Sequence, residues 1–439
     1  MPVFKVESMD HEARGVARRD GKTVFVEGAL PGEQVEASIY RRHPNYERAR
    51  LERVIRPSSQ RVEPVCPHFG TCGGCSMPQL GFAPPGALKV RTLPARFAGD
   101  PFGHAGRGGG GGFLPPILGP AWAYRTRARL TVRQVAKKGG VLVGFHERKS
   151  TYVTDMHQCP VLPGSVSALL PQMRRVVERL SIPTRIPQIE VAVAESGTAL
   201  VFRHLEPLTP ADHTVLDEFA RQYRVQIWLQ PKGPDSAHLA HPGEAPALHY
   251  THPEFGVCVY FRPTDFTQVN AGVNTMLVRR ALALLEPRPG EHIADLFCGL
   301  GNFTLPIARL GVSVVGVEGR ATLIERAEDN AARNGLSDRC QFRVADLFQS
   351  TSMSFLQFGR FDKLVVDPPR DGAIAVVKAL PNPPPARIVY VSCNPATLAR
   401  DAAYLVHERR YRLVAAGIAN MFPHTSHVES IACFEHERP

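Results

Sequence analysis

The chain has 439 residues, 44% of them hydrophobic, enough to bury a core in each of two or three domains; this excludes a disordered or fibrous protein. Its 52 Lys and Arg residues outnumber 41 Asp and Glu residues, and the formal net charge of +11 favours a polyanionic partner such as nucleic acid over a neutral small molecule. The N-terminus lacks an apolar signal-peptide segment, and no run of about 18 uncharged apolar residues occurs, so we expect a cytoplasmic protein that contacts no membrane.

Residues 1–60 are predicted to form a small β-barrel, because short strand-like runs alternate with turn residues. Basic side chains accompany Tyr40 and Tyr46, a mixture that suits backbone phosphates and exposed bases, although a solvated edge strand has the same composition. The segment 28–33, Gly-Ala-Leu-Pro-Gly-Glu, and the strand after it resemble the TRAM domain, an OB-like RNA-binding barrel.

Three cysteines follow in close succession, Cys66, Cys72 and Cys75, on a Gly-rich turn whose backbone N–H groups can donate to sulfur. Nine cysteines, unevenly spread, suit a metal site in a reducing compartment better than a disulfide framework. Cys159, which precedes a proline in a polar turn, is the expected fourth ligand. We favour an iron–sulfur cluster; zinc bound by the three cysteines and either Cys159 or His68 is the alternative that the spacing leaves open.

Residues 61–262 are predicted as a central mixed β domain that carries this site. Proline and glycine dominate residues 98–120, which predicts a mobile loop. Arg125, Arg127 and Arg129 alternate with small or apolar residues, so one strand face would present three guanidinium groups either to RNA or to solvent. Further strands are expected at 141–145 and 225–229, with a helix near 169–180.

Residues 263–439 alternate strands with helices, the pattern of a parallel α/β sheet. The strand at 291–297 runs into a Gly-x-Gly turn that ends at Gly301, where a ligand can approach the backbone closely. The next strand ends in Glu318, seventeen residues later, where an acid that binds ribose hydroxyl groups is expected.

Five strands of this half end in, or run into, polar side chains. The carboxyl ends of parallel strands meet at one edge of a sheet, so these groups are predicted to share a site, although each alone could be a helix cap. They are Asp295, Glu318, Asp346, Asp367 and Cys393. A lone cysteine at a strand end is more often a small buried hydrophobic side chain than a nucleophile. For Cys393, however, the neighbouring acids favour the role of a nucleophile.

The acidic strand end after Gly-x-Gly and a later Asp-Pro-Pro resemble a class I S-adenosylmethionine-dependent methyltransferase with a Rossmann-like fold. A dinucleotide oxidoreductase needs a third glycine where Thr304 stands. Within this class the chain is similar to the RNA uracil-C5 methyltransferases through five motifs in family order, at 265–270, 295–303, 367–370, 392–395 and 421–429. The TRAM-like barrel and four cysteines resemble the branch that methylates 23S ribosomal RNA, and not the tRNA-modifying branch.

The resemblance implies that Cys393 adds to C6 of a uracil and that Glu429 removes the C5 proton, a role for which His424 and His427 compete. It implies a [4Fe-4S] cluster on Cys66, Cys72, Cys75 and Cys159. The residues that match the family's pattern for S-adenosylmethionine are Gln268, Phe297, Asn302, Glu318, Asp346 and Asp367.

The predicted function is methylation of a uridine in 23S rRNA by a monomeric enzyme of three domains, 1–60, 61–262 and 263–439. One alternative is uracil methylation in tRNA or at another ribosomal uridine; a second is a non-catalytic iron–sulfur protein that binds RNA. Two departures from the family, the Gly-rich insertion at 106–112 and the proline-rich segment 80–86, lie where RNA contacts are expected.

Overall fold

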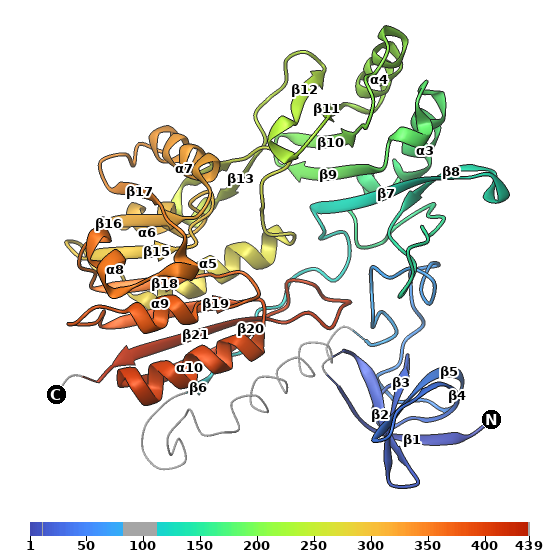
Figure 1. Ribbon diagram of the computed structural model, residues 1–439, viewed down its shortest axis with the longest axis horizontal. Coiled ribbons are helices and arrows are strands. Elements are labelled where there is room, and N and C mark those ends of the chain that lie inside the picture. Colours follow the sequence, from blue (N-terminus) through green and yellow to red (C-terminus); the bar gives the residue numbers. More distant parts are fainter. Residues whose placement is uncertain (11, 82–111, 438–439) are drawn as a thin grey trace.

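The computed structural model describes residues 1–10, 12–81 and 112–437. Three large sheets follow one another along the chain, and in Figure 1 the barrel (blue) and the central sheet (green) lie to one side of the C-terminal sheet (orange to red). Most of the Gly-rich insertion and of the proline-rich segment lies outside the described residues. Among the helices of the described residues, none is long and apolar enough to cross a membrane. The domain boundaries at 60 and 262 stay predictions.

The N-terminal sheet is a closed five-stranded barrel, which confirms the predicted architecture. Alternate side chains of each strand point inward, such as Phe4 and Val6 of the first strand, because the strand period is two. Below the barrel, buried Glu33 accepts hydrogen bonds from the Leu30 N–H and from Arg61. In barrel order the strands are β1 (Val3–Met9), β2 (Arg14–Arg19), β3 (Lys22–Glu27), β5 (Tyr46–Arg56) and β4 (Gln34–Arg42).

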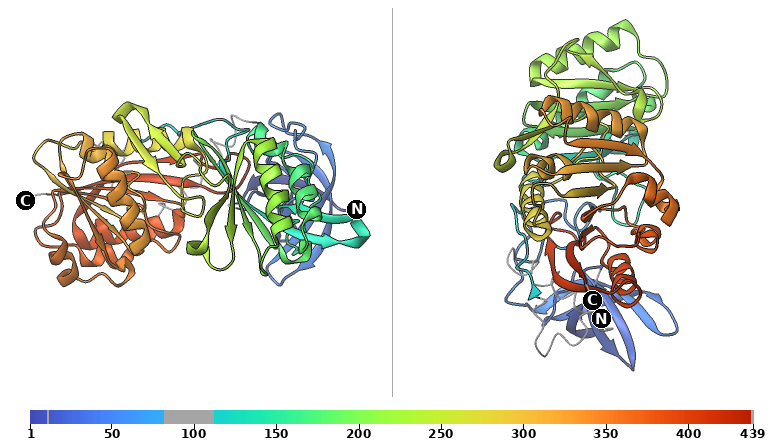
Figure 2. Two further views of the ribbon diagram at one scale, coloured as in Figure 1. Left: turned by 90° about the horizontal axis from the view of Figure 1, so that it is seen from above. Right: turned by 90° about the vertical axis from the view of Figure 1, so that its left-hand side faces the viewer.

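The central sheet has six strands, of which β10 and β11 are parallel and the other neighbours antiparallel. Helices α3 (Leu170–Arg179) and α4 (Pro210–Tyr223) pack together on this sheet (Figure 2). A capping box between Thr209 and Asp212 starts α4. In sheet order the strands are β12 (His238–His241), β11 (Val225–Gln230), β10 (Gly197–Arg203), β9 (Gln188–Ala194), β7 (Arg127–Val135) and β8 (Gly140–Gly144).

The three arginines near the start of β7 do not form the exposed face that the alternation predicts. Arg129 is exposed and pairs with Glu190. Arg127 donates a hydrogen bond from Nη2 to the carbonyl oxygen of Asp265, at 2.7 Å. The Arg125 guanidinium lies over an aromatic ring of the C-terminal half, that of Phe422. The prediction is wrong for Arg125 and Arg127 because the segment that enters β7 packs between two sheets.

The C-terminal sheet is the predicted α/β sheet with helices on both faces. Of its eight strands, the first five in sheet order are parallel to one another, the sixth is antiparallel to both of its neighbours, and short apolar strands such as Lys363–Val366 are buried on both faces. In sheet order they are β17 (Cys340–Val344), β16 (Ser313–Glu318), β15 (His292–Leu296), β18 (Lys363–Val366), β19 (Arg387–Ser392), β21 (Glu429–His436), β20 (Tyr411–Ala419) and β6 (Gly112–Phe113).

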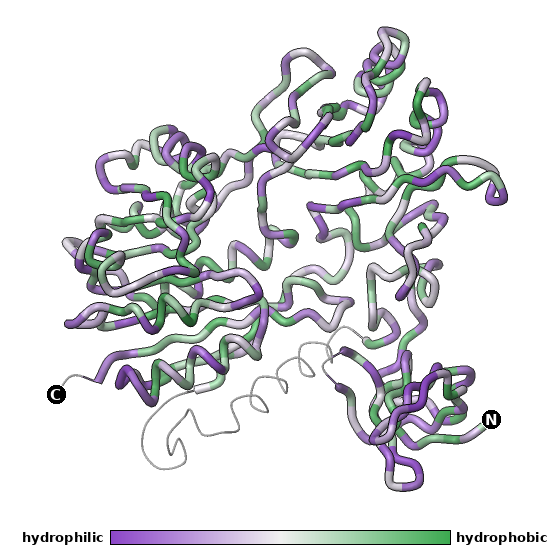
Figure 3. Tube along the Cα trace, viewed as in Figure 1, coloured by the Kyte–Doolittle hydropathy of each residue, from purple (hydrophilic) through white to green (hydrophobic). Residues whose placement is uncertain are grey.

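Two cores lie on opposite faces of this sheet. Figure 3 shows that many residues of its strands are hydrophobic. One core is shared with the hairpin of β13 (His249–His252) and β14 (Val257–Tyr260). On this face lie α5 (Ala271–Leu285), α6 (Thr304–Arg309) and α7 (Ala321–Arg333). On the other lie α8 (Ser352–Phe358), α9 (Ile374–Ala379) and α10 (Pro395–Arg409).

The strand β6 contradicts the predicted loop at its C-terminal end. Residues 112–113 pair with β20, the Leu114 N–H donates to the Ala416 carbonyl, and Ile117 is buried. An unpaired strand edge offers a row of backbone groups to any neighbouring segment. Gly417 makes the approach possible, because a Cβ there would lie 2.9 Å from the Cβ of Leu114. The conformation of this segment is fixed by its pairing with β20, which is distant in the sequence.

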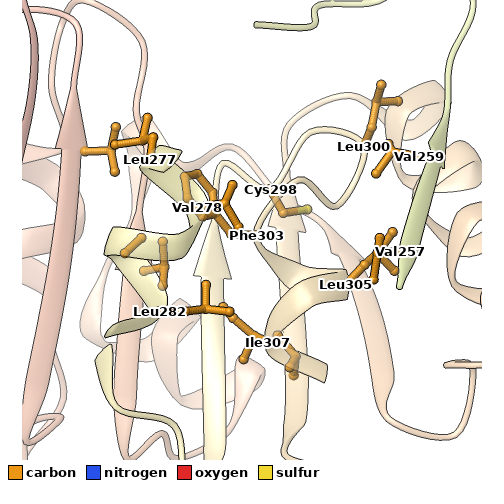
Figure 4. Close-up of a cluster of buried hydrophobic side chains, with 14 of the residues drawn as sticks. Val257, Val259, Leu277, Val278, Leu282, Cys298, Leu300, Phe303, Leu305 and Ile307 are labelled. Atoms are coloured by element: carbon orange, nitrogen blue, oxygen red, sulfur yellow. The ribbon is translucent and has the colours of Figure 1, made fainter. Parts of the chain in front are cut away.

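Cys298, at the end of β15, is a structural cysteine. Figure 4 shows its side chain in the apolar cluster that also contains Phe303 and Leu305. The residue is 4% exposed, and burial raises the pKa of its thiol well above the ordinary value. A buried neutral thiol behaves as a small hydrophobe. A position at the carboxyl edge of the sheet therefore does not by itself make a cysteine reactive.

Candidate active site and cysteine cluster

The pairing of β19 with β21 sets Cys393 beside Glu429. Ser392, the last residue of β19, pairs with Ser430 of antiparallel β21. Cys393 directly follows this last pair and Glu429 directly precedes it on the other strand, so the two lie next to each other, and the Glu429 charge acts on the Cys393 thiol. Opposite residues of an antiparallel pair point to the same face with Cβ atoms about 4.5–5.5 Å apart. The register thus brings together a thiol and a carboxyl group from two separate sequence motifs.

Asp295 and Asp367 belong to the same face of the sheet. Residues two apart along a strand share a face. The residues two positions from Asp295, Asp367, Cys393 and Glu429 all lie in the core beneath α5; they are Ile293, Val365, Val391 and Ile431. The four candidate groups therefore point to the side of the sheet that α5 and α6 cover, just beyond the edge of that core.

Glu429 is one of the strongly perturbed acids of this group. Its side chain is buried, and burial together with the negative charge of Asp367 raises its pKa to about 8, against the opposing effect of Arg370. Loss of hydration also raises the pKa of Asp367, to about 7. A carboxyl group with a pKa near the working pH exchanges protons readily, which is the property required of a general base.

Cys393 is half-buried and stands among the same charges. Burial raises its pKa to about 11, Glu429 and Asp367 add to this increase, and Arg370 opposes it. The side chain is therefore a neutral thiol at neutral pH in the free protein. Arg370 is the cation of the site, and sequence reasoning missed its role although it follows the Asp-Pro-Pro motif directly.

Asp295 connects the site to the Gly-x-Gly turn. Its Oδ2 accepts a 2.6 Å hydrogen bond from the hydroxyl group of Thr304, the first residue of α6. Burial, opposed by this bond, raises the pKa of Asp295 to about 7. Thr304 stands where a dinucleotide-binding turn has its third glycine. In this structure the threonine side chain holds the buried Asp295 by this hydrogen bond.

The turn after β15 has the geometry of a ligand-binding loop. Phe297 and Gly301 adopt φ values of +65° and +92°, the second of which favours glycine. Glu318 accepts hydrogen bonds from the N–H groups of Gly299 at 3.3 Å and Gly319 at 2.8 Å. Its carboxylate thus lies between the first turn and the end of β16, as the sequence predicts for an acid that binds ribose.

Phe297 and Asp346 approach the same place from two strands. The Phe297 ring lies 5.6 Å, between centroids, from that of Phe348. Asp346 is exposed and accepts a hydrogen bond from the Phe348 N–H at 3.0 Å, so it starts the turn that carries this ring. Asp346 has no interaction with the Cys393 group in the described structure. It lies with Phe297 and Glu318 on the part of the edge formed by β15, β16 and β17.

Asn302 and Gln268 are held by residues from outside the parallel strands. The Asn302 Oδ1 accepts hydrogen bonds from Tyr250, His252 and Asn274, at 3.0, 3.1 and 2.9 Å. The carbonyl group of Gln268 lies 3.5 Å from the hydroxyl group of Thr126 at the entrance to β7. Sequence reasoning missed Tyr250 and His252, because nothing in their local pattern indicates a distant asparagine.

All four predicted cluster cysteines line one cavity, with Phe145 and Met156 on its wall. Burial raises the pKa of Cys75 to about 12 and that of Cys159 to about 11, and thiolates at the neighbouring cysteines raise both further. The Gly74 N–H donates to the Cys72 sulfur at 3.4 Å. Four thiolates in such a cavity repel one another, so a cationic group would stabilise them.

The four cysteines share one cavity, and the metal or cluster that they would hold stays a prediction. Within the described ranges, no group of three or more His, Cys, Asp or Glu side chains is placed to hold one metal ion. A cluster distributes its four thiolate ligands over several iron atoms, so the sulfurs need not converge on one point. The close approach of Gly73 to the carbonyl oxygen of His146, where a Cβ would lie at 2.9 Å, fixes the cysteine turn against the neighbouring hairpin.

Two family models match the chain. The one described as tRNA (Uracil-5-)-methyltransferase matches residues 257–437, and the one described as TRAM domain matches residues 4–51. A solved structure, that of a Pyrococcus abyssi tRNA (uracil-54, C5)-methyltransferase in complex with S-adenosyl-L-homocysteine, has the same fold: the TM-score is 0.75 at 22% identity, over 98% of this chain and 99% of that one.

Relatives match over almost the whole chain. The 23S rRNA (uracil(1939)-C(5))-methyltransferase RlmD of Aromatoleum aromaticum is 59% identical over 436 residues, which are 99% of this chain and 100% of that protein. The enzyme of the same description from Bordetella avium is 58% identical over 99% of this chain and 91% of its own length. The chain therefore belongs to the RNA (uracil-C5)-methyltransferase family, in the branch of the 23S rRNA enzymes.

Proposed function

We propose that this protein uses S-adenosylmethionine to methylate C5 of one uridine in 23S rRNA, the uridine equivalent to position 1939 named for its relatives. The observation that carries the proposal is the register that sets Cys393 beside Glu429 at the edge of a methyltransferase-type sheet. Relatives that are 59% identical over their whole length support the substrate. We expect the protein to meet this substrate in the cytoplasm and to act there as a monomer.

Cys393 begins the reaction by adding to C6 of the uracil. C5 of uracil is a poor nucleophile; an electron pair from the Cys393 sulfur forms the S–C6 bond and moves the C5=C6 pair towards C5 and O4. The thiol must first lose its proton to water, and the Arg370 charge favours the thiolate. A uridine inside folded RNA must leave its stack for C6 to reach the sulfur.

S-adenosylmethionine supplies an electrophilic methyl group on a sulfonium sulfur. We propose that Glu318 binds its ribose and Phe297 lies against its adenosyl part, with Gln268, Asn302, Asp346 and Asp367 completing the site. The support is their place at the ends of β15, β16 and β18 or beside them. Asp367, with its raised pKa, is also placed to hold the edge of the uracil.

Glu429 completes the reaction by removing the C5 proton after methyl transfer. The C–H electron pair forms the C5=C6 bond, and the C6–S pair returns to Cys393, which frees the product. Its buried position and raised pKa suit this role. His424, the first competitor, is stacked on Trp122 with ring centroids 3.8 Å apart, an arrangement that favours a structural role.

The barrel supplies a basic surface for RNA. Arg41, Arg42 and Arg50 are exposed on β4 and β5, and their charge attracts phosphate groups without regard to sequence. Tyr40 is 46% exposed, and the ammonium group of Lys149 lies 5.5 Å from the centre of its ring. Lys149 also pairs with Glu27 of the barrel, so this contact joins the barrel to the hairpin beside the cysteine cavity.

We further propose that the four cysteines hold a [4Fe-4S] cluster with a structural role. Replacing Cys75 by serine should abolish the bound iron and sulfide and lower the thermal midpoint by about 5 °C or more, because metal-binding energy is also folding energy. Iron and sulfide assays and a thermal melt of protein purified without oxygen measure both effects. Cys258→Ser, at a half-buried cysteine outside the cavity, is the matched control. Stoichiometric zinc in the unaltered protein would contradict the cluster.

The substrate is tested by mapping 5-methyluridine in ribosomal and transfer RNA from cells with and without this protein, using mass spectrometry of RNA fragments. We expect the loss of one modified uridine in 23S rRNA and restoration by the intact gene. Loss from tRNA alone would overturn the assignment of the substrate but not the chemistry.

A further inference from the structure

The loop that leads to Glu429 is held by the segment that follows the third cysteine. This base loop, residues 420–428, joins β20 to β21. The N–H groups of Ser76 and Met77 both donate to the carbonyl oxygen of His424, at 2.9 and 3.2 Å. In the other direction, the Ser426 N–H donates to the hydroxyl oxygen of Ser76 at 3.0 Å. Three hydrogen bonds therefore connect segments about 350 residues apart.

A second contact holds the base loop from the other end of the cysteine cavity. The Trp122 ring stacks on the ring of His424, with centroids 3.8 Å apart and an angle of 24° between the planes. The next residue, Ala123, donates its N–H to the carbonyl oxygen of Pro160, which follows Cys159 directly. His424 thus lies between the neighbour of Cys75 and a segment hydrogen-bonded to the neighbour of Cys159.

Hydrogen bonds inside the base loop make it a compact turn. The Thr425 N–H and hydroxyl groups both lie within hydrogen-bond distance of the Phe422 carbonyl oxygen, at 3.2 and 3.1 Å. The His427 N–H donates to the Thr425 hydroxyl oxygen at 3.2 Å. Because the turn is short and internally bonded, a displacement of His424 or Ser426 shifts the start of β21, where Glu429 stands.

We propose that Ser76 and Trp122 are positioning residues for the proton-abstraction step, which fix the base loop so that Glu429 faces the uracil C5. The inference rests on the proposed role of Glu429. The proposal also explains why a reaction without electron transfer would need the cysteine site. The segments that carry the cysteines would align the general base. Small displacements of a catalytic group reduce rates by up to about 100-fold per ångström.

The test separates adduct formation from adduct breakdown. RNA that contains 5-fluorouridine traps the adduct because the fluorine cannot leave as a proton does, so its rate of capture on denaturing gels reports Cys393 addition and methyl transfer. Ordinary RNA requires proton removal as well. We expect Ser76→Ala to capture fluorinated RNA at the rate of the unaltered protein, to turn over ordinary RNA roughly 2- to 10-fold more slowly, and to accumulate the methylated adduct.

Trp122→Ala should show a larger effect of the same kind, and Trp122→Phe, which keeps a ring to stack on His424, should recover most of the rate. Hydrogen exchange gives a readout that needs no chemistry: the Ser426 amide should exchange faster in Ser76→Ala. The matched control is Ser196→Ala, which also removes one hydrogen bond between distant segments, from Ser196 to the Ala247 carbonyl oxygen, and should leave turnover and exchange in the base loop unchanged.

Parallel loss of capture and turnover in Ser76→Ala and Trp122→Ala would overturn the inference, because it would mean a general loss of folding or RNA binding. The inference would also be overturned if Ser76→Ala turned over ordinary RNA at the normal rate and its Ser426 amide exchanged at the normal rate. If the unaltered protein captured no fluorinated RNA, the covalent mechanism itself would fail, and the inference with it. The exchange of the Ser426 amide still reports whether the contact exists, so the two failures are distinguishable.

Discussion

Replacing Cys393 by alanine should abolish uracil methylation, with a loss of at least about 10⁴-fold in kcat. Without the sulfur, the proposed bond to C6 cannot form, and C5 stays a poor nucleophile. The variant should also form no adduct with RNA that contains 5-fluorouridine, whereas the unaltered protein should hold that RNA through a bond stable to denaturing electrophoresis. Single-turnover methylation and a gel assay of the adduct measure the two effects.

Cys433→Ala is the matched control for this experiment. Cys433 is buried on β21, the strand that carries Glu429, and its side chain packs in the core below the site. Its loss should cost some stability and leave adduct formation intact. Methylation by Cys393→Ala at more than a trace of the normal rate would rule out the covalent route, whatever the other residues of the site do.

Replacing Glu429 by glutamine should stop the reaction at its last step. Cys393 addition and methyl transfer need no base at C5, so the methylated RNA should remain bound to Cys393, and turnover should fall about 10²- to 10⁴-fold. Mass spectrometry of the protein–RNA adduct distinguishes a methylated from an unmethylated uracil. Glu435→Gln, on the same strand but paired with Arg387 at the surface, should turn over normally.

The pH dependence of the same step provides an independent check. Burial and Asp367 raise the pKa of Glu429 to about 8, so the carboxylate form that accepts the proton increases as pH rises through that value. At about pH 6 only about 1% of the side chains are carboxylates, and adduct breakdown should be about 100-fold slower than at its plateau. A jump of a preformed adduct from about pH 6 to about pH 9 should release methylated RNA rapidly.

A methylated adduct that breaks down at the same rate at both pH values would contradict a titrating base. The Cys393 thiol does not interfere with this measurement, because it is a thioether once the adduct has formed. Breakdown that stays pH-dependent in Glu429→Gln would assign the proton to another group, with His424 and His427 as the remaining candidates from the sequence.

Much of the C-terminal fold could be predicted because its signals are local. Strand periods and turn residues predicted β15 within a residue, at 291–297 against the observed His292–Leu296, and placed Glu318 at the end of the next strand. Parallel strands with short loops then require their carboxyl ends to share one edge. The gathering of polar side chains at this edge could therefore be predicted from the pattern, whereas the roles of Cys393 and Glu429 stay predictions that rest on the family resemblance.

Other features depend on partners far away in the sequence. Arg127 looked like a surface residue of an alternating strand, but its guanidinium group bonds the Asp265 carbonyl across the boundary between two sheets. Residues 112–113 looked like loop and became an edge strand because β20 had a free edge. Cys298 and Cys393 both follow strands, and only their surroundings distinguish a core side chain from a candidate nucleophile.

The sequence by itself determined the order of the main elements and the family, and it predicts the cysteine ligand set, because these depend on the type and spacing of residues. The tertiary structure decided the closeness of Cys393 and Glu429 at the end of the β19–β21 ladder, the raised pKa values at the site and the contact of Ser76 with the base loop. These depend on strand register and on burial. Both arise when segments hundreds of residues apart pack together and exclude water, which no local pattern encodes.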